Sequence, residues 1–189
     1  MHLFIQKAVS FIFLFSGIFT SHLNAEPGKY IPHEYLDYVD EISMDFAREV
    51  EKEFGLTAIG FGGCMPEKVE EIGIKFYCDK EMNINNARWL MITLRQKLVE
   101  KVNRHEKIRP FLAEYPFSIQ GANIQLTFLE NSDKNARNVE FVFFGKKGIY
   151  YCKFNQEKRK YDDLLIESYE DALQAYKPTD KPMIFKKVI

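Results

Sequence analysis

The segment Asn83–Arg104, NINNARWLMITLRQKLVEKVNR, is the element around which we expect the chain to be built, because its apolar residues recur every three or four positions. This spacing places them along one face of an α-helix. Trp89 and Val99 widen that face, so we expect the helix to lie across a broad apolar surface such as a β-sheet. Asn83 or Asn85 is expected to cap its first turn, because an asparagine side chain accepts hydrogen bonds from free backbone amides there.

Further helices and strands are expected on both sides of this segment. Apolar residues at helical spacing predict a first helix that begins at Pro32 and ends at Phe54, where Gly55 can adopt the left-handed conformation that terminates helices. A last helix is expected over Asp162–Tyr176, followed by a tail over residues 178–189. Alternating or short apolar segments predict five strands: Leu56–Gly62, Glu71–Asp79, Phe117–Glu130, Val139–Phe144 and Ile149–Phe154.

The order of these elements predicts the fold class. Strands that follow one another in groups, rather than alternating singly with helices, favour an α+β fold. We expect a single two-layer domain over residues 26–177, with a mostly antiparallel sheet of about five strands packed by three helices in the order α-β-β-α-β-β-β-α. Val139–Phe144 and Ile149–Phe154 are apolar on both faces and are expected to lie centrally in the sheet.

The N-terminus predicts export. Met1–Lys7 carries one cation, and the apolar run Ala8–Phe19 that follows is shorter than the roughly 20 residues a transmembrane helix needs. Ala25 is a small residue that suits signal-peptide cleavage before Glu26. We therefore expect residues 1–25 to be a cleaved signal peptide, and the mature protein to be soluble, periplasmic or secreted, with no membrane span. An uncleaved membrane anchor is the alternative.

Charge and cysteine content limit the classes of partner. Loss of Lys7 changes the formal net charge from −1 to −2, so we expect neither nucleic acid nor an anionic membrane to bind. The chain has an odd number of cysteines, Cys64, Cys78 and Cys152, so at least one thiol is unpaired or linked to another chain. Whether Cys78 forms a disulfide with Cys152 stays open. No cysteine or histidine pair has metal-ligand spacing, so neither a metal site nor a cofactor is expected.

The most irregular loop carries the candidate for catalysis. Cys64 follows a glycine-rich stretch, which can present backbone amides to a substrate. A thiolate nucleophile needs a neighbouring base or cation, and the histidines after the signal peptide are His33 and His105. A glycine-rich turn with an incidental cysteine explains the same residues, since no nucleophile signature surrounds Cys64.

Candidate binding residues lie on the central helix and on the strands. Arg88 and Arg95 are seven residues apart on one helical stripe, and with Arg109 they can form an anion site. The alternative is that they pair with acidic residues of the first helix and shield apolar surface with their methylene stems. Aromatic residues of the strands can line a groove for a glycan or peptide, or fill the core: Tyr77, Phe143, Phe144, Tyr150 and Tyr151.

Short motifs are spread over most of the chain after the signal peptide: Ala87–Arg88, Asn103, Ile108–Leu112, Tyr115–Phe117 and Glu167–Ala172. With these motifs the chain resembles a group of small exported bacterial proteins of unknown function. The resemblance implies a bacterial origin and supplies no activity, cofactor or site residue.

These observations favour an exported, non-catalytic domain that binds a protein, a peptide or an envelope component. A thiol-dependent hydrolase or transferase that uses Cys64 is the alternative from a different class. A purely structural envelope component is the third. The sequence leaves the oligomeric state open.

Overall fold

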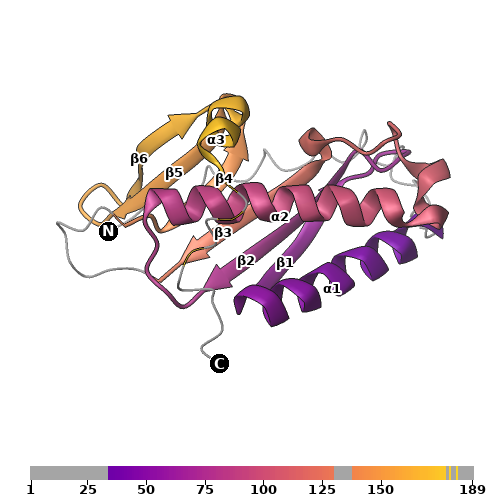
Figure 1. Ribbon diagram of the computed structural model, residues 1–189, viewed down its shortest axis with the longest axis horizontal. Helices are drawn as coiled ribbons and strands as arrows, with labels where there is room; N and C mark the ends of the chain where they lie inside the picture. The colour runs from indigo at the N-terminus through magenta and orange to yellow at the C-terminus, as the bar shows by residue number, and fades with distance from the viewer. Residues whose placement is uncertain (1–33, 130–137, 178, 180–181, 183–189) are drawn as a thin grey trace, which may run out of the picture. The chain divides into compact units, whose positions relative to one another are not determined.

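The computed structural model describes residues 34–129 and 138–177, together with residues 179 and 182. The expected signal peptide, its cleavage position between Ala25 and Glu26, His33 and most of the expected tail lie outside the described residues. Within them the fold is α+β, with three α-helices and one six-stranded mixed sheet (Figure 1). No described helix is both long enough and apolar enough to cross a membrane.

The elements follow the predicted order, with one additional strand. They are α1 Glu34–Phe54, β1 Thr57–Cys64, β2 Glu71–Cys78, α2 Ile84–Arg104, β3 Ala122–Phe128, β4 Phe141–Gly145, β5 Gly148–Asn155, β6 Lys160–Glu167 and α3 Tyr169–Ala175. Two 3-10 helices, η1 Glu106–Phe111 and η2 Ile119–Gly121, lead from α2 to β3. Gly55 ends α1 with φ of 69°, the left-handed conformation expected there.

The strands lie in the sheet in the order in which they occur in the sequence, from β1 at one edge to β6 at the other. Neighbouring strands are antiparallel except β2 and β3, which are parallel. The connection between β2 and β3 contains α2, and a parallel pair requires such a crossover. β4 and β5 are internal strands, as their two-sided apolar character predicted.

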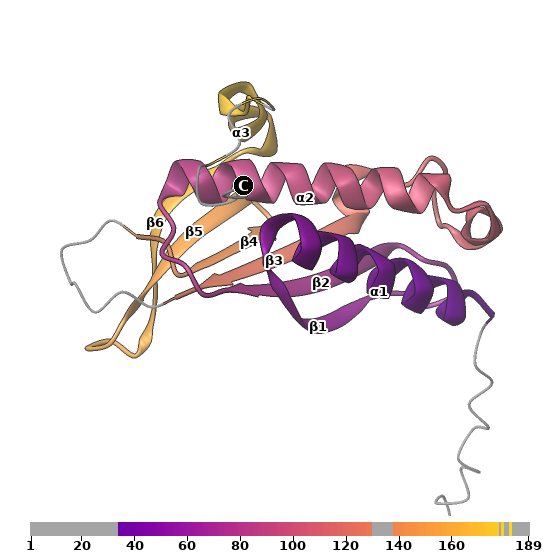
Figure 2. The same ribbon diagram turned by 60° about the horizontal axis from the view of Figure 1, so that its bottom comes forward.

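All three helices lie on the same side of the sheet (Figure 2). α1 contacts β1 and β2, while α2 lies beside α1 and contacts β3. The predicted N-cap of α2 is confirmed at Asn83, whose side chain accepts a hydrogen bond from Asn86 N at 2.9 Å. Leu90, Leu94 and Leu98 of α2 are completely buried, so the helix does lie across a broad apolar surface.

The predicted last helix is wrong in its first half. Residues 160–167 form β6 rather than helix, and α3 begins only at Tyr169. β5 would otherwise present a free edge, and pairing with seven residues of β6 satisfies its backbone groups better than a solvent-facing helix would. The helix starts after Ser168, whose hydroxyl accepts a hydrogen bond from Asp171 N at 3.0 Å.

Register assigns the strand residues to two faces, because residues paired across strands share a face. Val142 and Tyr151 are paired and buried beneath the helices, whereas Phe143 and Tyr150 are paired on the opposite face. We call this opposite face, which no described element covers, the open face. The side chains buried on the helical face include Ile72, Ile74, Phe76, Ile124, Leu126, Val142, Ile149 and Tyr151.

Candidate functional site

Cys64 is the last residue of β1, and its thiol is exposed. Its Sγ donates a hydrogen bond to Glu70 Oε2 at 3.5 Å. This bond raises the pKa of Cys64, with further contributions from desolvation and from the negative charges of Glu70 and Glu71. A raised pKa lowers the thiolate fraction, whereas a cysteine nucleophile requires the opposite shift.

His105 has a structural role at the end of α2. Its Nδ1 accepts a hydrogen bond from Ile108 N at 3.3 Å, which caps η1. Its Nε2 lies 3.7 Å from Glu41 Oε2, and its ring lies 5.7 Å from the ring of Tyr38. None of the contacts that the structure describes for His105 involves Cys64, so the geometry brings no Cys-His pair together.

The three candidate arginines do not form one site. Arg88 makes a bidentate ion pair with Glu167, with Nε–Oε1 and Nη2–Oε2 distances of 2.7 and 2.9 Å. Arg109 donates to Asn103 O at 3.1 Å, and its guanidinium lies 5.5 Å from the ring centre of Tyr115. The predicted alternative, pairing with acidic residues of the first helix, is therefore wrong for Arg88, whose partner belongs to β6.

Arg95 is the largest fully buried side chain among the described residues. Its Nη2 donates to Ile119 O, and its guanidinium lies 3.8 Å from the ring centre of Phe144 and 5.3 Å from that of Tyr169. Its Nε and Nη1 have no hydrogen-bond partner among the described residues. Burial lowers the pKa of Arg95 to about 10. With no exposed surface, this cation is not accessible to an anion in the observed conformation.

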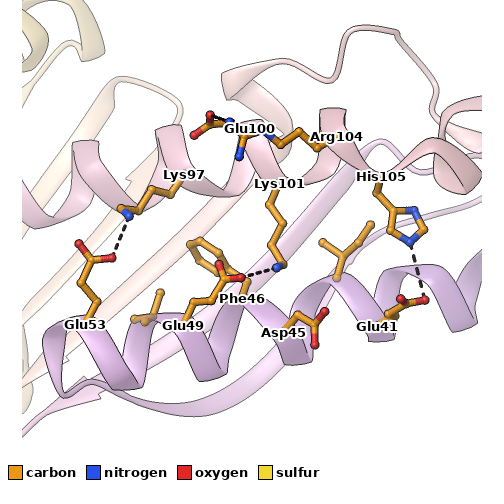
Figure 3. A pocket seen from close by; sticks show the side chains of 12 residues that line it. Glu41, Asp45, Phe46, Glu49, Glu53, Lys97, Glu100, Lys101, Arg104 and His105 are labelled. Carbon is orange, nitrogen blue, oxygen red and sulfur yellow. Dashed lines mark hydrogen bonds and ion pairs between the residues drawn. The ribbon is translucent and has the colours of Figure 1, made fainter.

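A hollow of about 370 Å³ lies between α1 and α2 (Figure 3). Charged pairs cross it, with Lys97–Glu53 and Lys101–Glu49 distances of 2.8 Å. Because bases of α2 already neutralise the acids of α1 that face them, the hollow offers a ligand little unpaired charge. We interpret it as the seam between the two helices. Its lining residues are Glu41, Ile42, Asp45, Phe46, Glu49, Val50, Glu53, Lys97, Glu100, Lys101, Arg104 and His105.

The open face of β4, β5 and β6 carries a cluster of aromatic rings. Phe143 stacks on Tyr150 with ring centres 4.8 Å apart and on Phe141 at 5.3 Å. Tyr161 contacts Phe141 at 5.5 Å and Phe154 at 5.4 Å. These rings pack against one another and are mostly half-buried, so they shield much of each other's apolar surface. By contrast Phe144 and Tyr151, which the sequence also singled out, face the helices.

Cys78 and Cys152 are buried and unpaired. Cys78 points toward the helices. Cys152 follows the helix-facing Tyr151 in β5, so it points to the open face. There its Sγ donates a hydrogen bond to Asp163 Oδ1 at 3.4 Å. β2 and β5 are three strand spacings apart, about 14 Å. That separation is well beyond the roughly 4.4–6.8 Å between Cα atoms that a disulfide allows, so the two thiols do not form one.

The two edges of the sheet differ in charge. β6 carries four charged residues among its eight. Glu167 is paired with Arg88, whereas Lys160, Asp162 and Asp163 are charges of the kind that deter edge-to-edge pairing. β1, TAIGFGGC, carries no charged residue and no proline over the same length. Both strands contain a bulge, and beyond the one in β1 the residues from Gly60 onward pair regularly with β2.

β1 also exposes large apolar side chains to solvent. Ile59 is 52% exposed and Phe61 is 50% exposed. Phe61 is in register with the buried Ile74, so it lies on the helical face of the sheet, beside α1. The sequence identified Leu56–Gly62 only as a short apolar strand. The signal that was missed is the absence of charge on a strand that turns out to lie at the sheet edge.

The described residues contain no group of three or more histidine, cysteine, aspartate or glutamate side chains arranged to hold a metal ion. Comparison of the chain with models of protein families, with curated proteins and with solved structures gave no significant match. The candidate site is therefore chosen from the geometry alone. We choose the β1 edge, because the structural contacts described above account for the other candidates and do not account for its exposed, uncharged strand.

Proposed function

We propose that the protein is an exported binding domain that takes up an extended segment of a partner protein as an additional strand along β1. The observation that carries this proposal is the uncharged outer edge of β1. Each edge strand presents a row of backbone N–H and C=O groups to solvent, and proteins usually protect such rows with charges or prolines. β6 has this protection and β1 lacks it.

The composition of β1 suits strand addition. Three of its eight residues are glycines, so side chains obstruct little of the approach of another backbone. Ile59 and Phe61 provide exposed apolar contacts beside that backbone. In strand addition the main-chain hydrogen bonds supply affinity and the alternating side chains supply specificity, so no preformed deep pocket is required.

The geometry supports binding better than thiol catalysis. The hydrogen bond to Glu70 disfavours the thiolate of Cys64, and His105 is engaged with Ile108 and Glu41. Export is also proposed, because residues 1–25 have the charge, length and small-residue pattern of a signal peptide. The partner is accordingly proposed to be a protein or peptide met outside the cytoplasm.

Backbone methylation of a peptide partner tests the proposal. Nine-residue peptides selected from a random display library against the intact protein would be remade in two forms, each N-methylated at alternate residues. Only one edge of an added strand faces β1, so one form should lose binding and the complementary form should keep it. Equal binding of both forms would show that side chains, and hence a different surface, carry the interaction.

A further inference from the structure

The charges of α1 are divided between two sides of the helix. The helix carries eight acidic and two basic residues, a net charge of −6. Glu49 and Glu53 face α2 and pair with its lysines. Asp40 and Glu51 are exposed and form no ion pair with any residue that the structure describes. The α2-facing side of α1 is therefore neutralised, whereas acidic charge remains unpaired elsewhere on the helix.

Asp40 and Glu51 lie on the side of α1 that faces the β1 edge. Asp40, Met44, Ala47 and Glu51 are separated by four, three and four residues, so they form one stripe along the helix. At 100° per residue, this stripe lies on the side of the helix opposite Glu41, Asp45 and Glu49, which line the hollow toward α2. Since α1 lies over β1 and β2, with α2 on its other side, the stripe faces outward past β1.

Together the stripe and the strand make a surface that is apolar in its middle and acidic at both ends. Met44 is 47% exposed and Phe61 of β1 is 50% exposed on the same side of the sheet. α1 and β1 are joined by the short connection at Gly55, so they run in opposite directions along each other. An added strand beside β1 would have alternate side chains directed toward this surface.

We propose that the β1 edge selects extended segments with a basic residue, an apolar residue and a second basic residue at alternate positions. This inference rests on the proposed strand addition and names the partner chemistry. The apolar residue contacts Met44 and Phe61, and the basic residues meet Asp40 and Glu51.

The spacing of the two basic residues follows from the rise per residue of helix α1 and of the added strand. Asp40 and Glu51 are eleven residues apart, which is about 16 Å along a helix. Residues i and i+4 of a strand are about 13 Å apart and point to the same face. The flexible stems of lysine and arginine span the remaining few ångströms. The predicted pattern is thus basic-x-apolar-x-basic.

A second copy of this chain fits the edge poorly. Pairing β1 with β1 of another copy about a two-fold axis would bring the unpaired acids Asp40 and Glu51 of two α1 helices close together. Like charges across an interface oppose association, whereas a basic segment is attracted. Charge complementarity therefore favours a basic extended peptide as the occupant.

The test uses a labelled nine-residue probe, Thr-Val-Lys-Thr-Leu-Thr-Lys-Val-Thr, and the full mature chain. Matched probes carry glutamine or glutamate in place of both lysines. Fluorescence anisotropy gives each affinity at low and high salt, and hydrogen exchange shows which strand the probe protects. The protein variant is Asp40→Asn/Glu51→Gln. Its control, Glu157→Gln/Glu170→Gln, removes the same charge near β6 and α3.

We expect the lysine probe to bind about three- to tenfold more tightly than the glutamine probe, and the glutamate probe more weakly still. The Asp40→Asn/Glu51→Gln variant should lose this preference, whereas the control keeps it, and high salt should reduce it. If all three probes protect β1 equally, the proposed preference for basic residues is wrong, while the proposed strand addition is supported. If none protects β1, or if a second copy occupies the edge, both proposals fail.

Discussion

Arg88 and Glu167 join the middle of the chain to its C-terminal part through a two-point ion pair, although 79 positions separate them in sequence. The side chains are only 15% and 12% exposed, and Tyr151 OH donates to the same carboxylate at 2.6 Å. The hydrogen bond from Arg88 to Glu167 raises the pKa of the arginine. The pair fixes β6 and β5 against α2.

Breaking this pair should destabilise the fold. Arg88→Met leaves a largely buried carboxylate without its cation, so we expect a loss of about 2–4 kcal/mol in the free energy of unfolding. Arg88→Met/Glu167→Gln removes both charges and should recover part of that loss. Urea denaturation measures each variant. A loss below about 0.5 kcal/mol for Arg88→Met would contradict the assigned geometry.

Replacing the buried Arg95 by methionine should not lower the free energy of unfolding in the way that replacing Arg88 does. Arg95→Met keeps most of the side-chain volume and removes an unpaired buried charge, so stability should stay the same or rise. Arg95→Ala leaves a cavity beside Phe144 and should cost about 2–5 kcal/mol. Thermal and urea unfolding compare the two. A large loss in Arg95→Met would mean that the cation has a stabilising partner that the described contacts do not include.

Cysteine labelling tests the electrostatics of the β1 end. Because Glu70 raises the pKa of the Cys64 thiol, alkylation at neutral pH should be slower than for a reference thiol and should accelerate as pH rises. Glu70→Ala lowers that pKa and should speed labelling, while His105→Asn should have no effect. Mass spectrometry follows the rates. Fast labelling at mildly acidic pH that depends on His105 would instead support a thiol enzyme.

The N-terminal prediction is tested by processing. Protein collected after export should begin at Glu26, because the Ala25–Glu26 bond follows the pattern of a signal cleavage site. Intact mass and N-terminal sequencing measure this directly. Retention of residues 1–25 in the exported material would contradict the proposed route.

The sequence predicted those elements whose apolar pattern is long or strictly alternating. α2 was predicted because its apolar positions repeat over five turns, and β2 because Ile72, Ile74 and Phe76 alternate. β6 was missed since Leu164, Leu165 and Ile166 are consecutive apolar residues, a pattern that fits strand and helix alike. The strand is favoured over the helix because the backbone groups at the free edge of β5 need hydrogen-bond partners.

The candidate site was less predictable, because it depends on tertiary position. Arg95 shares a helical stripe with Arg88, yet Phe144 and Tyr169 enclose it from distant parts of the chain. The lack of charge in β1 is visible in the sequence. It becomes informative only once strand order places β1 at an edge, and no local pattern specifies strand order.

Hydrogen exchange of backbone amides can show whether a partner binds as an extra strand along β1. In the free protein, the amides of β1 that face away from β2 should exchange rapidly, since nothing in the described structure pairs with them. On addition of a selected peptide, we expect new protection at alternate residues of Thr57–Cys64 and none along β6. Protection spread instead over the aromatic cluster of β4, β5 and β6, with β1 unchanged, would contradict strand addition at β1.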